Sequence, residues 1–551
     1  MSNLYNLARS GLSAAQAGIN TTGHNVANAN TPGFSRQQVL ISSAGAQGGP
    51  NGYSGRGVQV DAVRRIYDGF LTNQLNQSTT AGSALSTYSG QIGRINNLLA
   101  DRTVGISPAI SKFYDGVSAV ASNPVDPAAR QEMIGRANSL VSQLSTANQF
   151  LSDQQQSINQ QIDTTVQQIN SFAQRISNLN AAIVDARASV NGQVPNDLLD
   201  QRDQLITGMN ELVAVTVIQD GDSVNLSVGN GQTLLSGTRV FPLNAVQSAS
   251  DPARTALAYT AADGTVVELS DKSVSGGALG GLLQFRRETL DNVQNELGRI
   301  AIGLAVSFNE QHVKGLDAAG QLGQDFFSVA TPVPMANADN SGAASASFAY
   351  DDIGKLTTSD YQIQRKGADY VVTRHPEGSV VTTVAANTAA DADTELSFDG
   401  VTITISGASD ENDSWMIQPT RNGARDISVA ISDPGAIAAA DLEGGSANGR
   451  NALEMAALQT KGALANGTMS ITGAYSQLVN GVGVKTQAIQ TASTAQDSLT
   501  AQSFAAQQAV SGVNLNEEYI NLDYYVQHYN ASARLIDVAS TMFDTLLGLR
   551  A

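Results

Sequence analysis

Residues that could do chemistry are few in this chain of 551 residues. It has four histidines and no cysteine, which excludes disulfides, thiolate metal sites and thiol catalysis. His24, His312, His375 and His528 form no HExxH motif and no other cluster with metal-ligand spacing. We interpret His24 and His312 as residues that satisfy the end of a helix dipole, because each lies near the C-terminal end of a predicted helix.

The acidic clusters also lack a catalytic arrangement. Residues 220–225 (Asp-Gly-Asp-Ser-Val-Asn) are similar to the start of a calcium loop, but no glutamate closes the loop, and a hairpin turn explains them better. Residues 317–325 are interpreted as an irregular turn. Glu517 and Glu518 are adjacent on a predicted helix and point about 100° apart, which excludes an acid–base dyad. With no P-loop, nucleophile elbow or dinucleotide fingerprint, the sequence predicts a protein that is not an enzyme and needs no cofactor or metal.

Composition excludes further classes of partner. The chain carries 49 acidic and 31 basic residues, a net charge of −18, and a surface of that sign repels nucleic acid and anionic membranes. No run of about 18 apolar residues predicts membrane insertion, and the N-terminus lacks a cleavable signal peptide. The length predicts two to four domains.

The first 28 residues have the period of a helix. One apolar position recurs every seven residues, at Tyr5, Leu12, Ile19 and Val26. An amphipathic core helix and a coiled-coil seam both explain this stripe. The following segment is Asn25-Val-Ala-Asn28-Ala-Asn30-Thr31-Pro32-Gly33-Phe34, in which asparagines end the helix and Pro-Gly fits a type II turn. A short strand at Val39 and Ile41 and a glycine-rich mobile loop over 43–57 are expected next.

Three further segments predict long helices. Asp126 is a good N-cap before Pro127, and thirteen of sixteen heptad positions from there to residue 186 are apolar, which predicts a rod of about 90 Å. Similar patterns run over 279–312 and 471–510. We expect the first rod to pack against 279–312 and 471–508, because each stripe needs a partner.

Between the rods the period changes to two. Residues 212–218 and 401–405 predict strands, with turns at Asp220-Gly221, Asp263-Gly264 and Asp399-Gly400. Residues 331–440 hold 15 acids and 6 bases, which indicates an acidic β-rich module that faces water.

The last element is a helix from Asn514 to Leu549. Asn514 and Glu517 predict a capping box. The apolar stripe comprises a heptad row, a neighbouring row and two flanking residues: Leu522, Tyr529, Ile536 and Phe543; Val526, Ala533 and Leu547; Tyr525 and Leu546. Such a stripe at a chain end must bury itself against a partner.

Both ends of the chain resemble a known family. The segment 22–34 (Thr-Gly-His-Asn-Val-Ala-Asn-Ala-Asn-Thr-Pro-Gly-Phe) is similar to the N-terminal signature of flagellar rod, hook and hook-associated axial proteins. Its continuation Phe34-Ser35-Arg36-Gln37, the segment 511–518 (Ser-Gly-Val-Asn-Leu-Asn-Glu-Glu) and the segments 529–534 and 542–547 are typical of the hook-associated protein 1 family. The resemblance covers 1–200, 275–327 and 450–551 and says little about 328–440.

This resemblance implies a structural subunit of the bacterial flagellum at the junction between hook and filament, secreted unfolded through the type III export apparatus. The implied partners are further copies of the chain in a ring-like layer, the hook protein, hook-associated protein 3 and an export chaperone. An exported adhesin or host-surface ligand, or a hook-type axial protein, is the alternative.

The implied fold is α+β and multidomain, with long coiled-coil-like helices and inserted β-rich domains. Residues 1–65 with 510–551 form a terminal inner-tube domain. Residues 66–205 with 275–327 and 445–509 form the rod domain, and 206–274 and 328–444 are the outer β-rich insertions. The subunit-interface residues expected from the two ends are Tyr5, Leu12, Ile19, Asn25, Val26, Asn28, Thr31, Pro32, Gly33, Phe34, Leu515, Leu522, Tyr525, Val526, Tyr529, Ile536, Phe543 and Leu547.

Overall fold

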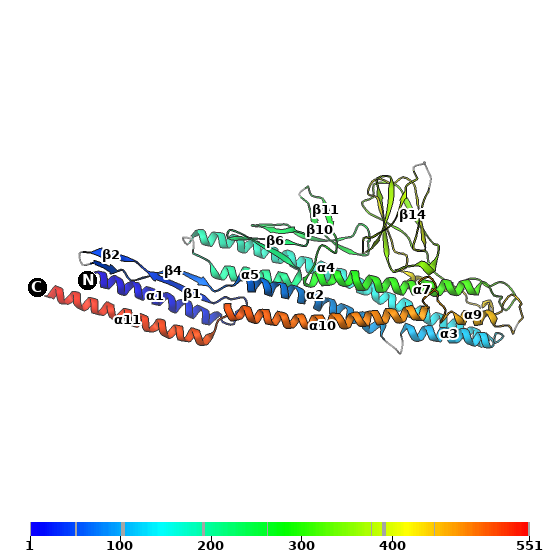
Figure 1. The fold of residues 1–551 in the computed structure, drawn as a ribbon, viewed down its shortest axis with the longest axis horizontal. Coiled ribbons are helices and arrows are strands. Elements are labelled where there is room, and N and C mark those ends of the chain that lie inside the picture. The colour runs from blue at the N-terminus through cyan, green and yellow to red at the C-terminus, as the bar shows by residue number, and fades with distance from the viewer. Residues whose placement is uncertain are drawn as a thin grey trace.

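The computed structural model describes residues 2–49, 52–100, 105–189, 193–261, 263–375, 377–387, 393–445 and 447–548. The molecule is elongated, and both ends of the chain lie at the same tip (Figure 1). Long helices run along its length and β-rich parts project from one side. The predicted α+β fold class with long terminal helices is confirmed.

The terminal end consists of two helices and a β ribbon. Helix α1 (Ser2–Asn28) contacts both α11 (Leu515–Gly548) and the ribbon that β1 (Gln37–Ser43) forms with β4 (Val58–Arg65). The turn after α1 has the predicted type II character, since Phe34 N–H donates to Thr31 O and Gly33 has a φ of +79°.

The expected loop over 43–57 is wrong in part. Here β2 (Ala46–Gly49) pairs with β3 (Gly52–Gly55) in antiparallel register. Glycine lowers strand propensity, but the paired strands β1 and β4 already hold the two backbones side by side and extend the hairpin.

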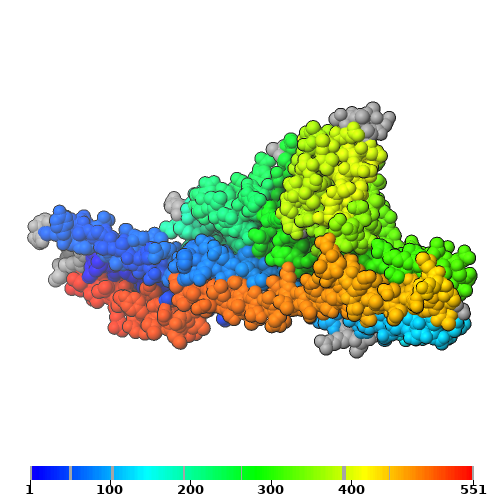
Figure 2. All heavy atoms as spheres, turned by 45° about the vertical axis from the view of Figure 1, so that its right-hand side comes forward, coloured from blue at the N-terminus to red at the C-terminus, as the bar shows by residue number. Residues whose placement is uncertain are grey.

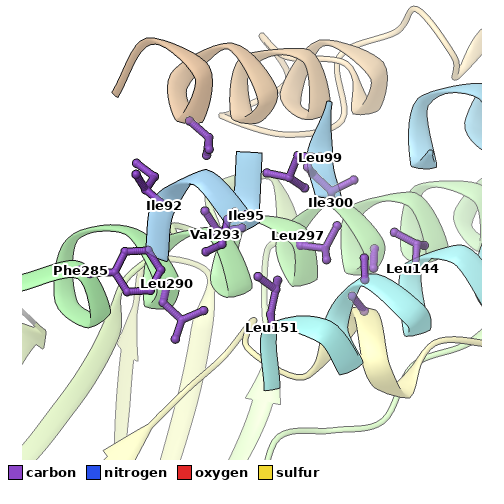
Figure 3. Close-up of a cluster of buried hydrophobic side chains, with 14 of the residues drawn as sticks. Ile92, Ile95, Leu99, Leu144, Leu151, Phe285, Leu290, Val293, Leu297 and Ile300 are labelled. Carbon is purple, nitrogen blue, oxygen red and sulfur yellow. The ribbon is translucent and has the colours of Figure 1, made fainter. Parts of the chain in front are cut away.

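The rod contains the remaining helices. Their bounds are α2 Gly69–Leu99, α3 Ile106–Ser122, α4 Pro127–Ser189, α5 Asn196–Leu212, α6 Gly277–Phe285, a π-helical turn Arg286–Leu290, α7 Asp291–His312, α8 Gly423–Asp426, α9 Arg450–Ala457 and α10 Ile471–Ser511. Buried side chains of α2, α4 and α6–α7 meet along its axis, among them Ile95, Leu151 and Leu297 (Figure 3). Each of these three residues is fully buried, so the rod has a continuous core.

Helix α4 forms as its sequence predicts. Asp126 caps it by accepting a hydrogen bond from Ala128 N–H at 2.9 Å. The three polar positions in the heptad pattern, Asn148, Gln155 and Thr165, are all buried. Two of them donate within the helix: the Thr165 hydroxyl to Gln161 O at 2.7 Å and the Gln155 amide to Asn159 at 3.3 Å.

The expected partners of α4 are right for one rod and wrong for the other. Helix α4 contacts α6 and α7, but α10 packs along α2. The α2–α10 seam is polar: Ser78 and Ser503 lie 3.2 Å apart, and Gln496 donates to Ser78 O. Small polar side chains let the two helices approach closely along this part of the seam.

The second rod is interrupted where the heptads suggest continuity. A π-helical turn over Arg286–Leu290 joins α6 to α7. Arg286 is 1% exposed and donates to Thr255 O and to both carboxylate oxygens of Asp271. The turn thus places a buried guanidinium against the first β insertion.

Two β-rich parts project from the rod. The first contains β5 Val215–Asp220, β6 Ser223–Val228, β7 Gln232–Ser236, β8 Arg239–Val240, β9 Leu243–Gln247, β10 Thr255–Thr260 and β11 Val266–Leu269. Its sheets have the orders β5-β6-β7-β8 and β11-β10-β9. Its buried side chains, such as Leu226 and Leu257, belong to the same core as the rod. The strand predicted over 212–218 begins at Val215 instead, because α5 continues through Leu212.

The second β-rich part has a core of its own, around Trp415 and Ile403. Its strands are β13 Met335–Ala336, β14 Ser345–Tyr350, β15 Asp360–Lys366, β16 Asp369–His375, β17 Val380–Ala385, β18 Thr394–Phe398, β19 Val401–Ser406 and β20 Ser414–Ile417, in the orders β13-β20-β15-β16-β17 and β14-β19-β18. Strands β12 (Phe327–Ser328) and β21 (Ser428–Val429) pair beneath it. The part projects sideways from the rod (Figure 2).

A buried ion-pair network joins this second part to α7. Asp291 in the first turn of α7 pairs with Arg254 and with Arg421. Arg421 also pairs with Asp360 on β15. Burial would raise the pKa of Asp291, but the two guanidinium groups lower it, so the carboxylate stays charged. The acidic module is thus anchored by some of its own charges, which the sequence analysis placed in water.

His312 has a different role from the predicted one. It is fully buried, its Nδ1 lies 2.6 Å from Gln324 O, and its Nε2 accepts from Ala438 N–H at 2.9 Å. An accepting Nε2 carries no proton, so the ring is neutral and donates through Nδ1. Burial lowers the pKa of His312, and a neutral ring cannot act as the cation that the helix dipole favours.

Candidate subunit interface

Helices α1 and α11 pack through a seam of glycines on α1. A Cβ atom added to Gly18 would lie 2.6 Å from Cγ and Cε1 of Tyr525, and one added to Gly11 would lie 2.8 Å from the Ser532 hydroxyl oxygen. Both pairs are separated by seven residues on their helices. The seam thus repeats every seven residues, but on α1 its glycines lie one residue before the predicted row of Leu12 and Ile19, and on α11 it follows Tyr525 and Ser532 rather than the predicted row of Leu522 and Tyr529.

The predicted interface residues on α11 divide into two groups. Leu522, Tyr525 and Ile536 are half-buried on the side that faces α1. Burial raises the pKa of the Tyr525 hydroxyl. The others keep between 37% and 54% of their surface exposed: Leu515, Val526, Tyr529, Phe543 and Leu547. The side chain of Leu546 lies outside the described residues.

The predicted residues at the N-terminal end divide in the same way. Tyr5 is 51% exposed, while Leu12, Ile19 and Val26 are half-buried along one flank of α1. In the turn, Thr31, Pro32 and Gly33 are exposed, whereas Asn28 and Phe34 are half-buried. Asn28 donates to His24 O, and the ring of His24 meets that of Phe34 edge-on.

Asn25 belongs to a buried polar joint between the two ends of the chain. Its amide donates to Gln37 O and to the Glu518 carboxylate, at 2.9 and 3.0 Å, and its oxygen accepts from Gln37 N–H. Arg36 donates to Glu518 through Nε at 2.7 Å and to Glu517 at 2.8 Å. Arg36 N–H also donates to Ser511 O at the end of α10. Asn25 and Arg36 of the N-terminal segment thus bind the chain at the point where α10 ends and α11 begins.

The predicted capping box at this point is half right. Asn514 caps α11 by accepting from Asn516 N–H at 3.0 Å. Glu517 pairs with Arg36 rather than returning to the backbone of Asn514. Glu518 is only 1% exposed and accepts hydrogen bonds from both Asn25 and Arg36 inside the joint. Sequence analysis missed the role of Arg36 and Glu518, since their partners lie about 480 residues away.

A second polar layer ties the joint to the rod. Asp200 on α5 accepts from Ser35 N–H and from Arg65, at 2.9 and 2.8 Å. Asp203 also pairs with Arg65. Burial raises the pKa of Asp203 even though Arg65 opposes the shift. The orientation of the terminal helices relative to the rod is therefore set by hydrogen bonds and ion pairs.

One surface of α11 stays largely exposed in the part of the chain that the structure describes. It is an outer apolar row, 40–70% exposed, on the side of the helix away from Tyr525 and Ser532: Ile520, Tyr524, Leu535, Val538 and Met542. The sequence analysis missed this row because it placed the apolar stripe along Leu522 and Tyr529 and the rows beside them. The 4-7-4-3-4 spacing of 520, 524, 531, 535, 538 and 542 marks a second apolar face.

The acidic segments that the sequence analysis considered for metal binding form turns. Within the described ranges no three His, Asp or Glu side chains gather so as to hold a metal ion. No helix among those residues combines the length and apolar character needed to span a bilayer. The 220–225 segment is a hairpin, in which Asp222 pairs with Arg187, and Asp317 organises an irregular turn by accepting from Ala319 and Gln321 N–H.

Comparisons with known proteins agree along the whole chain. The model of the flagellar hook-associated protein FlgK helical domain matches residues 92–327, and that of the hook-associated protein 1 D2-like domain matches 335–419. The flagella basal body rod protein model matches 6–34. Flagellar hook-associated protein 1 of Salmonella typhimurium is 40% identical over 559 residues and covers 100% of both chains. This chain belongs to the flagellar hook-associated protein 1 family.

Further relatives support this membership. Flagellar hook-associated protein 1 of Escherichia coli is 37% identical over 554 residues, with 100% of both chains covered. The structure of the flagellar hook junction protein FlgK from Burkholderia pseudomallei is 30% identical and covers 80% of this chain and 100% of its own, with a TM-score of 0.74. The predicted family and its structural role in the flagellum are confirmed, and the D2-like match extends the family to residues for which the motifs said little.

Proposed function

We propose that this protein forms a layer of subunits at the junction between the flagellar hook and filament, held together by α1, α11 and the signature turn. The observation that carries the proposal is the outer apolar row of α11. Five large apolar side chains remain exposed on a helix whose other apolar face already packs on α1. Exposed apolar faces of this length mark protein contacts.

The proposed role assigns a task to each part. The half-buried residues Leu522, Tyr525 and Ile536 hold the two terminal helices together within one copy. The exposed residues, with the outer apolar row, meet neighbouring subunits. The rod and the two β-rich parts stay outside this inner contact, and the division into terminal, rod and outer domains follows the same logic.

The remaining partners in this proposal rest on the family. We expect the hook protein on one side of the layer and hook-associated protein 3 on the other. The chain leaves the cell unfolded through the type III export apparatus, with a chaperone bound in the cytoplasm, and works outside the cell without enzymatic activity. The absence of cysteine is compatible with this route, since no disulfide has to form on the way.

The test replaces the outer apolar row and leaves the seam intact. Tyr524 and Val538 are 55% and 51% exposed, so changing both to Asp should leave the monomer folded while cells lose attached filaments and shed filament protein. The matched control changes Thr541 and Thr545, exposed polar residues of the same helix, to Asp. Circular dichroism and melting of the purified proteins check the fold. Cells that keep full-length filaments with the Tyr524→Asp, Val538→Asp protein would refute the proposal.

A further inference from the structure

The charges of the two chain ends are opposite in sign. Residues 2–65, which form α1 and the ribbon, contain five arginines and one aspartate, a net charge of +4 with His24 neutral. Helix α11 contains five acidic residues and one arginine, Arg534, a net charge of −4. The N-terminal end therefore has a positive net charge, although the net charge of the whole chain is −18.

Part of this complementarity is used within the chain. Arg36 pairs with Glu517 and Glu518, and Arg65 pairs with Asp200 and Asp203. These pairs belong to the polar joint described above.

Within the described residues, the charges of the two ends that form no ion pair are three arginines and Asp61 at the N-terminal end, and three aspartates and Arg534 on α11. Arg9, Arg56 and Arg64, here called the arginine surface, are exposed and have no ion-pair partner within the described part of the chain. Asp523, Asp537 and Asp544, here called the acidic row, are likewise exposed, and none of them has an ion-pair partner among the residues that the structure describes. The two sets match in number and are opposite in charge.

The acidic row follows the geometry of the helix. Asp523, Asn530, Asp537 and Asp544 are spaced by seven residues, so the three carboxylates lie along one side of α11. This side faces neither Tyr525 nor Ser532, whose side chains pack on α1. The carboxylates thus occupy an exposed side of α11 that is distinct from the outer apolar row.

The two charged surfaces point to different sides of one molecule. Helix α1 contacts both the ribbon and α11, and it lies between them (Figure 1). The ribbon arginines and the carboxylates of α11 are thus separated by a helix within one copy. A second copy can bring them together without any rearrangement of the chain.

We propose that the acidic row of one copy docks on the arginine surface of the next copy. This inference rests on the proposed function and names the contact between copies within the layer. Because the two surfaces are different, each copy offers one to each neighbour, and such a heterologous contact generates a closed ring or a helix rather than a two-fold dimer. Charge complementarity of this kind sets register and excludes wrong partners.

Charge reversal tests the contact from both sides. The first variant changes Asp523, Asp537 and Asp544 to Lys; the second changes Arg9, Arg56 and Arg64 to Glu. Each, expressed alone in cells that lack the native protein, should reduce attached filaments to below a tenth of the native level. A control variant changes Asp153, Asp163 and Asp185 to Lys, three exposed aspartates of α4 without an ion pair in the described structure, and should keep native numbers.

Co-expression identifies the partner. The two reversed chains are complementary to each other in both directions, so together they should restore at least half of the attached filaments. A single chain that carries all six changes should also restore them. Matching circular dichroism and melting curves for both purified variants show that loss of filaments is not loss of fold.

Each other outcome overturns the inference in a distinct way. Native filament numbers with either variant alone would show that the charges make no contact, while the proposed function would still stand on the outer apolar row. Loss without rescue by co-expression would show that the partner is a different protein rather than a second copy. Failure of the outer-row test, by contrast, removes the proposed function itself.

Discussion

The glycine seam makes a sharp prediction at Gly18. An alanine there would place its Cβ 2.6 Å from two ring atoms of Tyr525, whereas carbon atoms in contact are about 3.5–4.0 Å apart, so the ring must move by about 1 Å or leave the seam. Overpacking of this size costs about 1–3 kcal/mol. Alanine also favours the helix over glycine by about 1 kcal/mol, which offsets part of that cost.

Gly23 supplies the matched control. It lies on the same helix, and a Cβ added there would meet no atom within 4 Å. Gly23→Ala should therefore stabilise α1 by about 1 kcal/mol, and the intrinsic helix term cancels when the two variants are compared. Gly18→Ala should be less stable than Gly23→Ala by about 1–3 kcal/mol, and the difference isolates the clash with Tyr525.

Native-state hydrogen exchange of the α1 amides measures this difference, because it reports the free energy of local opening. Adding Tyr525→Ala removes the ring and should eliminate most of the difference between the two alanine variants, as a double-mutant cycle requires. Equal protection of α1 in the Gly18→Ala and Gly23→Ala proteins would refute the reasoning, since it would mean that Tyr525 does not occupy this notch.

Three further predictions concern the joint, the rod and the seam. Arg36→Ala leaves the Glu518 carboxylate buried with a single amide donor and should destabilise the joint by about 3–5 kcal/mol, measured as faster exchange in the first turns of α11. Burial of neutral His312 lowers its pKa in the folded state, so its contribution to stability is fully present above the unfolded pKa of about 6.5 and is lost as the pH falls through the lowered folded pKa. The His312→Gln protein should be less stable than the native protein at pH 8. Between pH 7 and pH 5 it should lose less stability than the native protein, as measured by urea titrations. Changing Leu522 and Ile536 to Asp should abolish filament attachment and, because both face α1, should also release α11 to limited proteolysis while the rod keeps its melting temperature.

The long helices were predictable because their seams are apolar. In α4, the heptad pattern starts at a capping aspartate and runs without a phase slip, and the structure buries even the polar positions of that pattern. Periodicity shows that a helix has a face to bury, but it does not show which partner covers that face. For this reason α10 was assigned to α4, whereas its small polar residues fit α2.

The candidate interface was predictable in part for a related reason. The apolar stripes of α1 and α11 identify both helices as partners, and the seam follows their heptad spacing. A search for apolar residues does not find the contact between Gly18 and the Tyr525 ring, because glycine has no side chain. The outer apolar row was also missed, because α11 has two apolar faces and the sequence analysis considered one. The joint at Glu518 depends on residues from opposite ends of the chain, and only the folded arrangement brings them within 3 Å.

The proposed position of the protein is tested most directly by gold labelling of purified flagella. An antibody against the projecting part over 335–419 recognises a region that stands away from the rod. We predict a single band of label at the boundary between hook and filament on each flagellum. Label spread along the filament, or restricted to the cell surface, would contradict the account.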